Sequence, residues 1–195
     1  MSQYTELQLD ALRELANIGS GTASTALSGM LGRSVDISVP SAKALPFADA
    51  VDATGDPETE MTGIVLGIQG DMGGTVLLLV APEDADAMCR LLGLEPGDEF
   101  ALSALGEIGN IVGASYINAL GSMTGMALEP TPPVTATDML GSIVATVLAG
   151  AALTGDVALL LDSNLVVEGE DCSISFLLVP DQGGVDELLS RLGLN

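Results

Sequence analysis

The sequence predicts an α/β protein of the α+β type, with long helices packed on a largely antiparallel β-sheet. Two long segments repeat apolar residues at helical spacing, whereas the stretches after them hold shorter apolar runs bounded by turn residues. The ends of the two halves also match, because residues 78–82 and 177–180 each precede a short helical segment that ends in Leu-Gly-Leu. We therefore expect one domain made of two repeats with pseudo-two-fold symmetry, at about residues 1–97 and 98–195.

The first repeat has five expected parts. These are a helix at 6–31, a strand at 35–40, an exposed loop at 48–60, a hairpin of strands 62–69 and 74–81, and a helix at 82–92. The long helix is followed by Gly32, a common stop, and the strand alternates apolar with polar residues up to Pro40. The loop is acidic and rich in turn residues. Pro82 suits the first turn of the last helix.

The second repeat follows the same plan. The expected parts are a helix at 99–124, a strand-like run at 127–137, a helix at 139–150, strands at 156–162 and 172–179 around a solvated loop at 162–171, and a helix at 183–192. Asp138 is the expected N-cap of the second of these helices. The β-branched residues of that segment would also suit a buried strand. In the long helix, close packing or the approach of a partner would explain Gly106, Gly109 and Gly113.

The charge of the chain excludes several classes of partner. Of 195 residues, 27 are acidic and five are basic, which gives a net charge of −22. Such a chain repels nucleic-acid phosphates and anionic membrane surfaces, so we expect no nucleic acid and no membrane as partners. Self-repulsion on this scale is well screened in 1 M salt, where the Debye length is about 3 Å. The composition resembles that of proteins from salt-loving archaea, and an unusually acidic mesophilic protein is the alternative.

The cysteines and the start of the chain point to the cytoplasm. Cys89 and Cys172 lie in apolar segments and are expected to be small buried hydrophobes rather than a disulfide. The N-terminal residues lack the basic and apolar pattern of a secretory signal. The longest uncharged apolar run, 143–153, is too short to span a bilayer.

A short polar pattern occurs once in each long helix. It comprises Asp10, Glu14, Asn17 and Pro40 in the first repeat, and Ser103, Glu107, Asn110 and Pro133 in the second, with 22 residues between Asn and Pro in both. Helix positions i, i+4 and i+7 share one face, so each copy places a small polar residue, a carboxylate and a carboxamide on one stripe. Most apolar residues lie on the opposite face. We therefore expect two polar stripes on helix surfaces, not deep pockets.

A solvated helix face is the ordinary explanation for one Glu-x-x-Asn, because Glu is a good helix former. Repetition at the same spacing weighs against it. So does Asn, a mediocre helix former that stands mid-helix in both copies.

The absence of histidine narrows the chemistry of the stripes. It excludes a Ser-His-Asp triad, a His-activated thiol and a Cys/His zinc site. A carboxamide can accept a hydrogen bond from water and donate one to an oxyanion, and a Gln positions the attacking water in this way in GTP hydrolysis. A Glu can pair with a lysine or arginine of another protein. Such a stripe would complete an active site on a partner that already holds a phosphoryl group and a metal.

The repeated pattern resembles that of the CheC/FliY/CheX phosphatases of bacterial and archaeal chemotaxis. Two copies in a chain of this length are typical of the CheC branch, since CheX carries one site per chain and FliY has additional flagellar-switch segments. The resemblance implies a hydrolase that removes the aspartyl phosphate of the response regulator CheY. Asn17 and Asn110 would orient the attacking water, and Glu14 and Glu107 would pair with the regulator's lysine.

The resemblance also implies partners. Mg²⁺ would be bound by CheY, leaving this chain with no cofactor of its own, and the receptor deamidase CheD would bind and stimulate the phosphatase. Two sites on one chain remove the need for a dimer, so we expect a monomer. The alternative is a non-catalytic adaptor that binds CheD or phosphorylated CheY and regulates them. A flagellar-switch role has no supporting segment.

Overall fold

The computed structural model describes residues 4–95, 97–151, 157–167 and 170–194. Its elements are α1 (Glu6–Leu31), β1 (Val35–Pro46), α2 (Phe47–Thr54), β2 (Glu60–Gly70), β3 (Gly74–Val80), α3 (Pro82–Leu91), α4 (Ala101–Thr124), β4 (Leu128–Pro130), β5 (Val134–Met139), α5 (Leu140–Ala151), β6 (Val157–Val167), β7 (Glu170–Pro180) and α6 (Gly184–Arg191). The order helix, strand, helix, two strands, helix occurs twice, except that β4 and β5 together take the place of β1.

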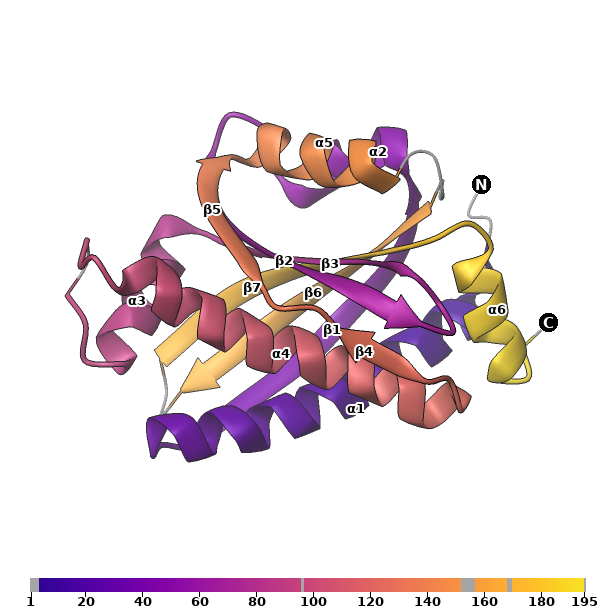
Figure 1. The fold of residues 1–195 in the computed structure, drawn as a ribbon, viewed down its shortest axis with the longest axis horizontal. Coiled ribbons are helices and arrows are strands. Elements are labelled where there is room, and N and C mark those ends of the chain that lie inside the picture. The colour runs from indigo at the N-terminus through magenta and orange to yellow at the C-terminus, as the bar shows by residue number, and fades with distance from the viewer. Residues whose placement is uncertain (1–3, 96, 152–156, 168–169, 195) are drawn as a thin grey trace.

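The strands form one seven-stranded antiparallel sheet, which confirms the predicted fold class. Its order is β1-β6-β7-β3-β2-β4, and β5 pairs with β2 beside β4. Helices α1 and α4 cover one face, and α2 and α5 cover the other (Figure 1). Each face has its own apolar cluster, and the larger one lies under the two long helices. Both polar stripes are therefore carried on the same side of the sheet.

The long helices begin and end where the sequence predicts, within two residues. Thr5 and Gln8 form a capping box at the start of α1, and Gly32 follows its end in the left-handed conformation at φ 63°. The predicted close packing of the α4 glycines is confirmed. A Cβ at Gly109 would lie 2.6 Å from Ile64 Cγ2, and one at Gly113 would lie 2.9 Å from Leu66 Cδ1. These glycines let α4 lie directly on β2.

Two expectations for the first repeat are wrong. The first strand does not end at Pro40, because β1 continues to Pro46 after a register shift between Ser38 and Ser41 in its pairing with β6. Proline is tolerated there because β1 is an edge strand. The exposed loop expected at 48–60 instead contains α2 over Phe47–Thr54. Ala50 of α2 is fully buried in the apolar cluster on the face of the sheet that α2 and α5 cover. This burial outweighs the acidic composition of the segment.

Two expectations for the second repeat also differ from the structure. The loop expected at 162–171 lies largely within β6 and β7, since buried Ser163, Leu165 and Val167 continue the two-residue alternation of a strand; residues 168–169 lie outside the described part. Asp138 is not the N-cap of α5, because β5 extends to Met139. The first amides of α5 donate instead to the carbonyls of Thr59 and Pro57.

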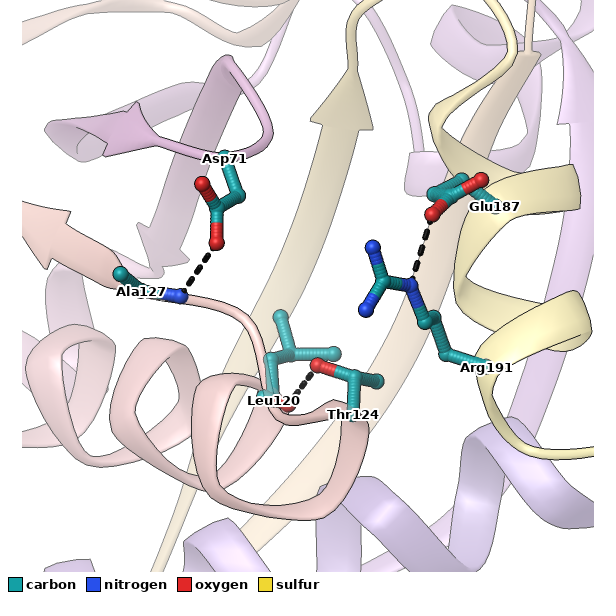
Figure 2. Close-up of polar contacts among 6 residues, drawn as sticks. All are labelled: Asp71, Leu120, Thr124, Ala127, Glu187 and Arg191. Carbon is teal, nitrogen blue, oxygen red and sulfur yellow. Dashed lines mark hydrogen bonds and ion pairs between the residues drawn. The ribbon is translucent and has the colours of Figure 1, made fainter.

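The far end of α4 is tied to the β2–β3 turn (Figure 2). The Asp71 amide donates to the Ala127 carbonyl at 2.9 Å, and the Ala127 amide donates to Asp71 Oδ2 at 2.8 Å. The Thr124 hydroxyl donates to the Leu120 carbonyl at 2.6 Å in the last turn of α4. This end of the helix is thus attached to the sheet on which its glycines rest.

Candidate functional site

The first stripe lies along α1 and is only partly exposed. Asp10 and Glu14 are exposed, whereas Asn17 is half-buried. Asp10 Oδ1 lies 2.9 Å from Arg13 Nη2, a surface ion pair worth at most about 1 kcal/mol. Glu14 forms no ion pair with any residue that the structure describes. Its carboxylate is therefore available to a partner.

The carboxamide of Asn17 is held by the sheet. Its Oδ1 accepts a hydrogen bond of 3.0 Å from the amide of Val39, the residue before Pro40. Val39 lies where β1 loses its register with β6, so its amide is turned toward the helix. The structure thus brings Asn17 to the backbone beside Pro40. The sequence predicted that the carboxamide would lie on the helix surface, whereas in the structure it is half-buried against the strand.

Asn17 is the first of three side chains that cover the free edge of β1. Ser24 Oγ accepts from the Ile37 amide, and Ser28 Oγ accepts from the Val35 amide, both at 2.9 Å. The three acceptors lie at i, i+7 and i+11 on one face of α1, and the three donors alternate along the strand. An edge strand whose amides are occupied in this way is protected from pairing with another chain. The alternating pattern of β1 and the matching serines were the missed signal in the sequence.

The second stripe lacks this row of contacts. In α4 the positions that match Ser24 and Ser28 are Ile117 and Gly121, which have no side-chain acceptor. The position that matches Val39 is Pro132, which has no amide hydrogen. Within the described part of the chain, the half-buried side chain of Asn110 forms no hydrogen bond. The two carboxamides therefore differ although their sequence motifs are alike.

An open pocket lies beside the second stripe. Its volume is about 320 Å³, and it is lined by Leu102, Ser103, Gly106, Glu107, Pro133 and Thr135. A Cβ at Gly106 would lie 2.9 Å from Thr135 Oγ1, so the glycine lets α4 and β5 approach closely here. The structure thus brings Ser103, Glu107 and Pro133 together, with Asn110 one turn further along α4. Sequence reasoning missed Thr135, whose hydroxyl adds a polar group to the pocket.

Exposed apolar side chains stand at the start of both stripes. Leu7 and Phe100 occupy matching positions, one turn before Asp10 and Ser103, and are 67% and 60% exposed. Large exposed apolar residues beside polar groups are typical of protein-binding surfaces. In the described residues, no group of three or more potential metal ligands occurs, and no helix is long and apolar enough to cross a membrane.

The duplicated stripe on this fold defines the class of protein. The CheC-like family model matches residues 7–43 and 100–136, and each matched segment runs from the start of a long helix past the proline of the motif. The chain is also 30% identical over 198 residues to the CheY-P phosphatase CheC of Bacillus subtilis, which covers 96% of this chain and 95% of that protein. The chain belongs to the CheC-like family.

Two further comparisons agree with this assignment. The flagellar motor switch phosphatase FliY of Bacillus subtilis is 29% identical over 140 residues, which cover 68% of this chain and 36% of that protein. The crystal structure of Thermotoga maritima FliY superposes with a TM-score of 0.80, covers 98% of each chain and is 21% identical. This structural likeness supports the fold.

Proposed function

We propose that the chain hydrolyses the aspartyl phosphate of a CheY-type response regulator. The observation that carries the proposal is the second stripe, which lies beside an open pocket. Among the residues that the structure describes, Glu107 has no ion-pair partner and the Asn110 carboxamide has no hydrogen-bond partner. Membership of a family whose relatives include a CheY-P phosphatase supports the same activity. The pocket is open, so another protein can reach it.

The proposed reaction needs two contributions from this chain, one from Asn110 and one from Glu107. Asn110 Oδ1 accepts a hydrogen bond from the attacking water and aligns the water oxygen with the phosphorus atom. The water oxygen bonds to phosphorus while the bond between phosphorus and the regulator's aspartate oxygen breaks. The aspartate carboxylate stays on the regulator, and inorganic phosphate leaves with the protons of the water. Glu107 pairs with a lysine of the regulator and holds the two proteins in register. Mg²⁺ bound by the regulator would neutralise the phosphoryl oxygens.

We propose unequal contributions from the two copies. The oxygen that Asn17 would use to orient water already accepts from Val39, so this carboxamide cannot turn without breaking a hydrogen bond. Asn17 and Glu14 remain a proposed second site, with the lower turnover. Ser103, Pro133, Asp10 and Pro40 are proposed to support the geometry of the two sites.

The test is the decay of phosphorylated regulator from the same organism, followed in high salt. Asn110→Ala should lower the stimulated rate by about 10²-fold, the usual cost of one well-placed polar group in catalysis. Asn17→Ala should have a smaller effect, and the double variant should abolish stimulation. Asn118→Ala is the matched control, because Asn118 is an exposed Asn of the same helix outside the motif. Unchanged decay with the wild-type chain would refute the phosphatase proposal.

The alternative proposal is an adaptor that binds phosphorylated CheY or CheD without turnover. The engaged carboxamide of Asn17 favours this role for the first copy. Binding of CheD and of regulator can be measured by calorimetry on the Asn17→Ala, Asn110→Ala double variant. If the chain is an adaptor, the double variant should bind both proteins normally, and the wild-type chain should leave the phosphate on the regulator intact. Light scattering on the same samples tests the proposed monomer.

A further inference from the structure

The residue 22 positions after each Asn differs between the repeats in a single chemical group. In the first repeat, the amide of Val39 is not paired with β6, because the register shifts between Ser38 and Ser41, and it donates to Asn17 Oδ1. In the second repeat the matching residue is Pro132, which has no amide hydrogen. The matching backbone position therefore supplies a donor in the first repeat and cannot supply one in the second.

Neighbouring contacts strengthen this difference. Ser24 and Ser28 hold α1 to the strand at Ile37 and Val35. Asn17 therefore lies at the end of a row of contacts that already fixes the spacing of helix and strand. The matching Ile117 is fully buried, and a Cβ at the matching Gly121 would lie 2.9 Å from the Met126 carbonyl oxygen. Helix α4 is thus held by apolar packing and leaves the edge of β4 and β5 without side-chain acceptors at these positions.

We propose that residues 39 and 132 are positioning residues that decide how freely each carboxamide can turn toward a partner. The Val39 amide holds Asn17 against β1, and Pro132 keeps the matching place free of a donor so that Asn110 stays available. An Asn oxygen that already accepts one hydrogen bond retains one lone pair, but its direction is set by the bond it has made. The effect on turnover rests on the proposed phosphatase function, whereas the effect on the hydrogen bonds does not.

Amide hydrogen exchange on the intact chain tests the hydrogen bonds directly. The Val39 amide should exchange about 10-fold faster or more in Asn17→Ala than in the wild type. In Pro132→Ala, the new amide at position 132 should be protected from exchange by donating to Asn110. This protection should be lost in the double variant Pro132→Ala, Asn110→Ala. Equal exchange in either pair would overturn the proposal, whether or not the chain is a phosphatase.

Dephosphorylation of the regulator tests the consequence. In the Asn110→Ala background, Val39→Pro should raise the remaining rate by about 3- to 10-fold, the effect of freeing one neutral hydrogen bond. In the Asn17→Ala background, Pro132→Ala should lower the rate by a similar factor. Pro130→Ala is the matched control, since it adds an amide in β4 away from the match to Val39.

The two arms separate the possible failures. Should Val39→Pro misfold, the Pro132→Ala pair decides alone, because Pro132 is exposed between β4 and β5 and its replacement removes little packing. A fall in rate with Pro130→Ala equal to that with Pro132→Ala would contradict the proposal. If amide exchange changes as predicted but the wild-type chain does not dephosphorylate the regulator, the positioning role is retained and the phosphatase proposal is refuted.

Discussion

The hydroxyl of Tyr116 in α4 lies 2.7 Å from Ser20 Oγ in α1, in the buried contact between the two helices that carry the polar stripes. Tyr116 also lies 3.3 Å, oxygen to oxygen, from Ser163 of β6 and stacks at 4.4 Å on Phe176 of β7. A Cβ on Gly19 would lie 3.0 Å from Tyr116 Cα, so the helices are close at this point. One side chain thus joins both long helices to the sheet between the two sites.

Removing the hydroxyl of Tyr116 should destabilise the fold even when the aromatic ring is kept. In Tyr116→Phe, Ser20 still donates to the Ala16 carbonyl, but the buried hydroxyl of Ser163 loses its described partner. The expected loss is about 1–2 kcal/mol in the free energy of unfolding, measured with denaturant at constant high salt. Tyr116→Ala should cost about 3–5 kcal/mol, because it also leaves a cavity. Equal losses for the two variants would contradict a role for the hydroxyl.

Stability should fall in alkaline solution. Burial raises the pKa of the Tyr116 phenol, although hydrogen bonds to Ser163 and Ser20 oppose the shift. An unfolded tyrosine loses its proton near pH 10. The folded chain then holds more protons than the unfolded chain, so the free energy of unfolding decreases as the pH rises above about 10.

The alkaline effect has two contributors that can be separated. Burial also raises the pKa of the Cys89 thiol. Because an unfolded cysteine loses its proton at a lower pH than an unfolded tyrosine, Cys89 should begin to lower the free energy of unfolding at a lower pH than Tyr116 does. Tyr116→Phe should flatten the decline above about pH 10, and Cys89→Ala should flatten its earlier part. Unfolding curves from pH 8 to 11 measure both. An unchanged slope in Tyr116→Phe would show that the phenol does not contribute.

A matched pair of glycine substitutions tests how closely α4 lies on the sheet. Gly109→Ala places a methyl group 2.6 Å from Ile64 Cγ2 and should destabilise the chain by about 1–3 kcal/mol. Gly21→Ala in α1 meets no atom within 4 Å and should stabilise it by about 0.5–1 kcal/mol through helix propensity. Thermal unfolding of both variants measures the difference. Shifts of the same sign would contradict the close packing of α4.

The exposed ring of Phe100 should contribute to partner binding more than to folding. Phe100→Ala is expected to raise the KM for phosphorylated regulator by about 10-fold, as loss of an aromatic anchor at an interface does, and to leave kcat nearly unchanged. Its effect on unfolding should stay within about 0.5 kcal/mol. Met123→Ala is the control, because Met123 is 40% exposed on the same helix but lies at its far end. An equal rise of KM in both variants would argue against a docking role.

Salt should stabilise the chain strongly. We propose adaptation to high salt because a net charge of −22 repels itself until it is screened. The midpoint of thermal unfolding should rise steadily from 0.1 M to about 2 M KCl. Sucrose at matched osmolality is the control, since it favours burial without screening charge. An unfolding midpoint independent of KCl would refute the salt adaptation.

The regular elements were largely accessible to sequence reasoning because their signals are local. Apolar spacing, Gly32 and the first-turn Pro82 place α1 and α3, and the apolar runs at 62–69 and 74–81 around a glycine-rich turn place the β2–β3 hairpin. The errors arose where tertiary burial outweighs composition, as at Ala50 in α2, or where backbone carbonyls replace a side-chain cap, as at Asp138. The division into two repeats remains a prediction that the repeated order of elements supports.

The sequence by itself determined that Glu14 and Asn17, like Glu107 and Asn110, share a helix face, because helical periodicity depends only on spacing along the chain. Only the tertiary structure decided that the two carboxamides differ. A strand 22 residues away brings the Val39 amide to Asn17, whereas the matching place in the second repeat is occupied by Pro132. A hydrogen bond depends on which backbone donor the fold brings within reach of an acceptor, and this depends on strand register and helix packing rather than on the motif.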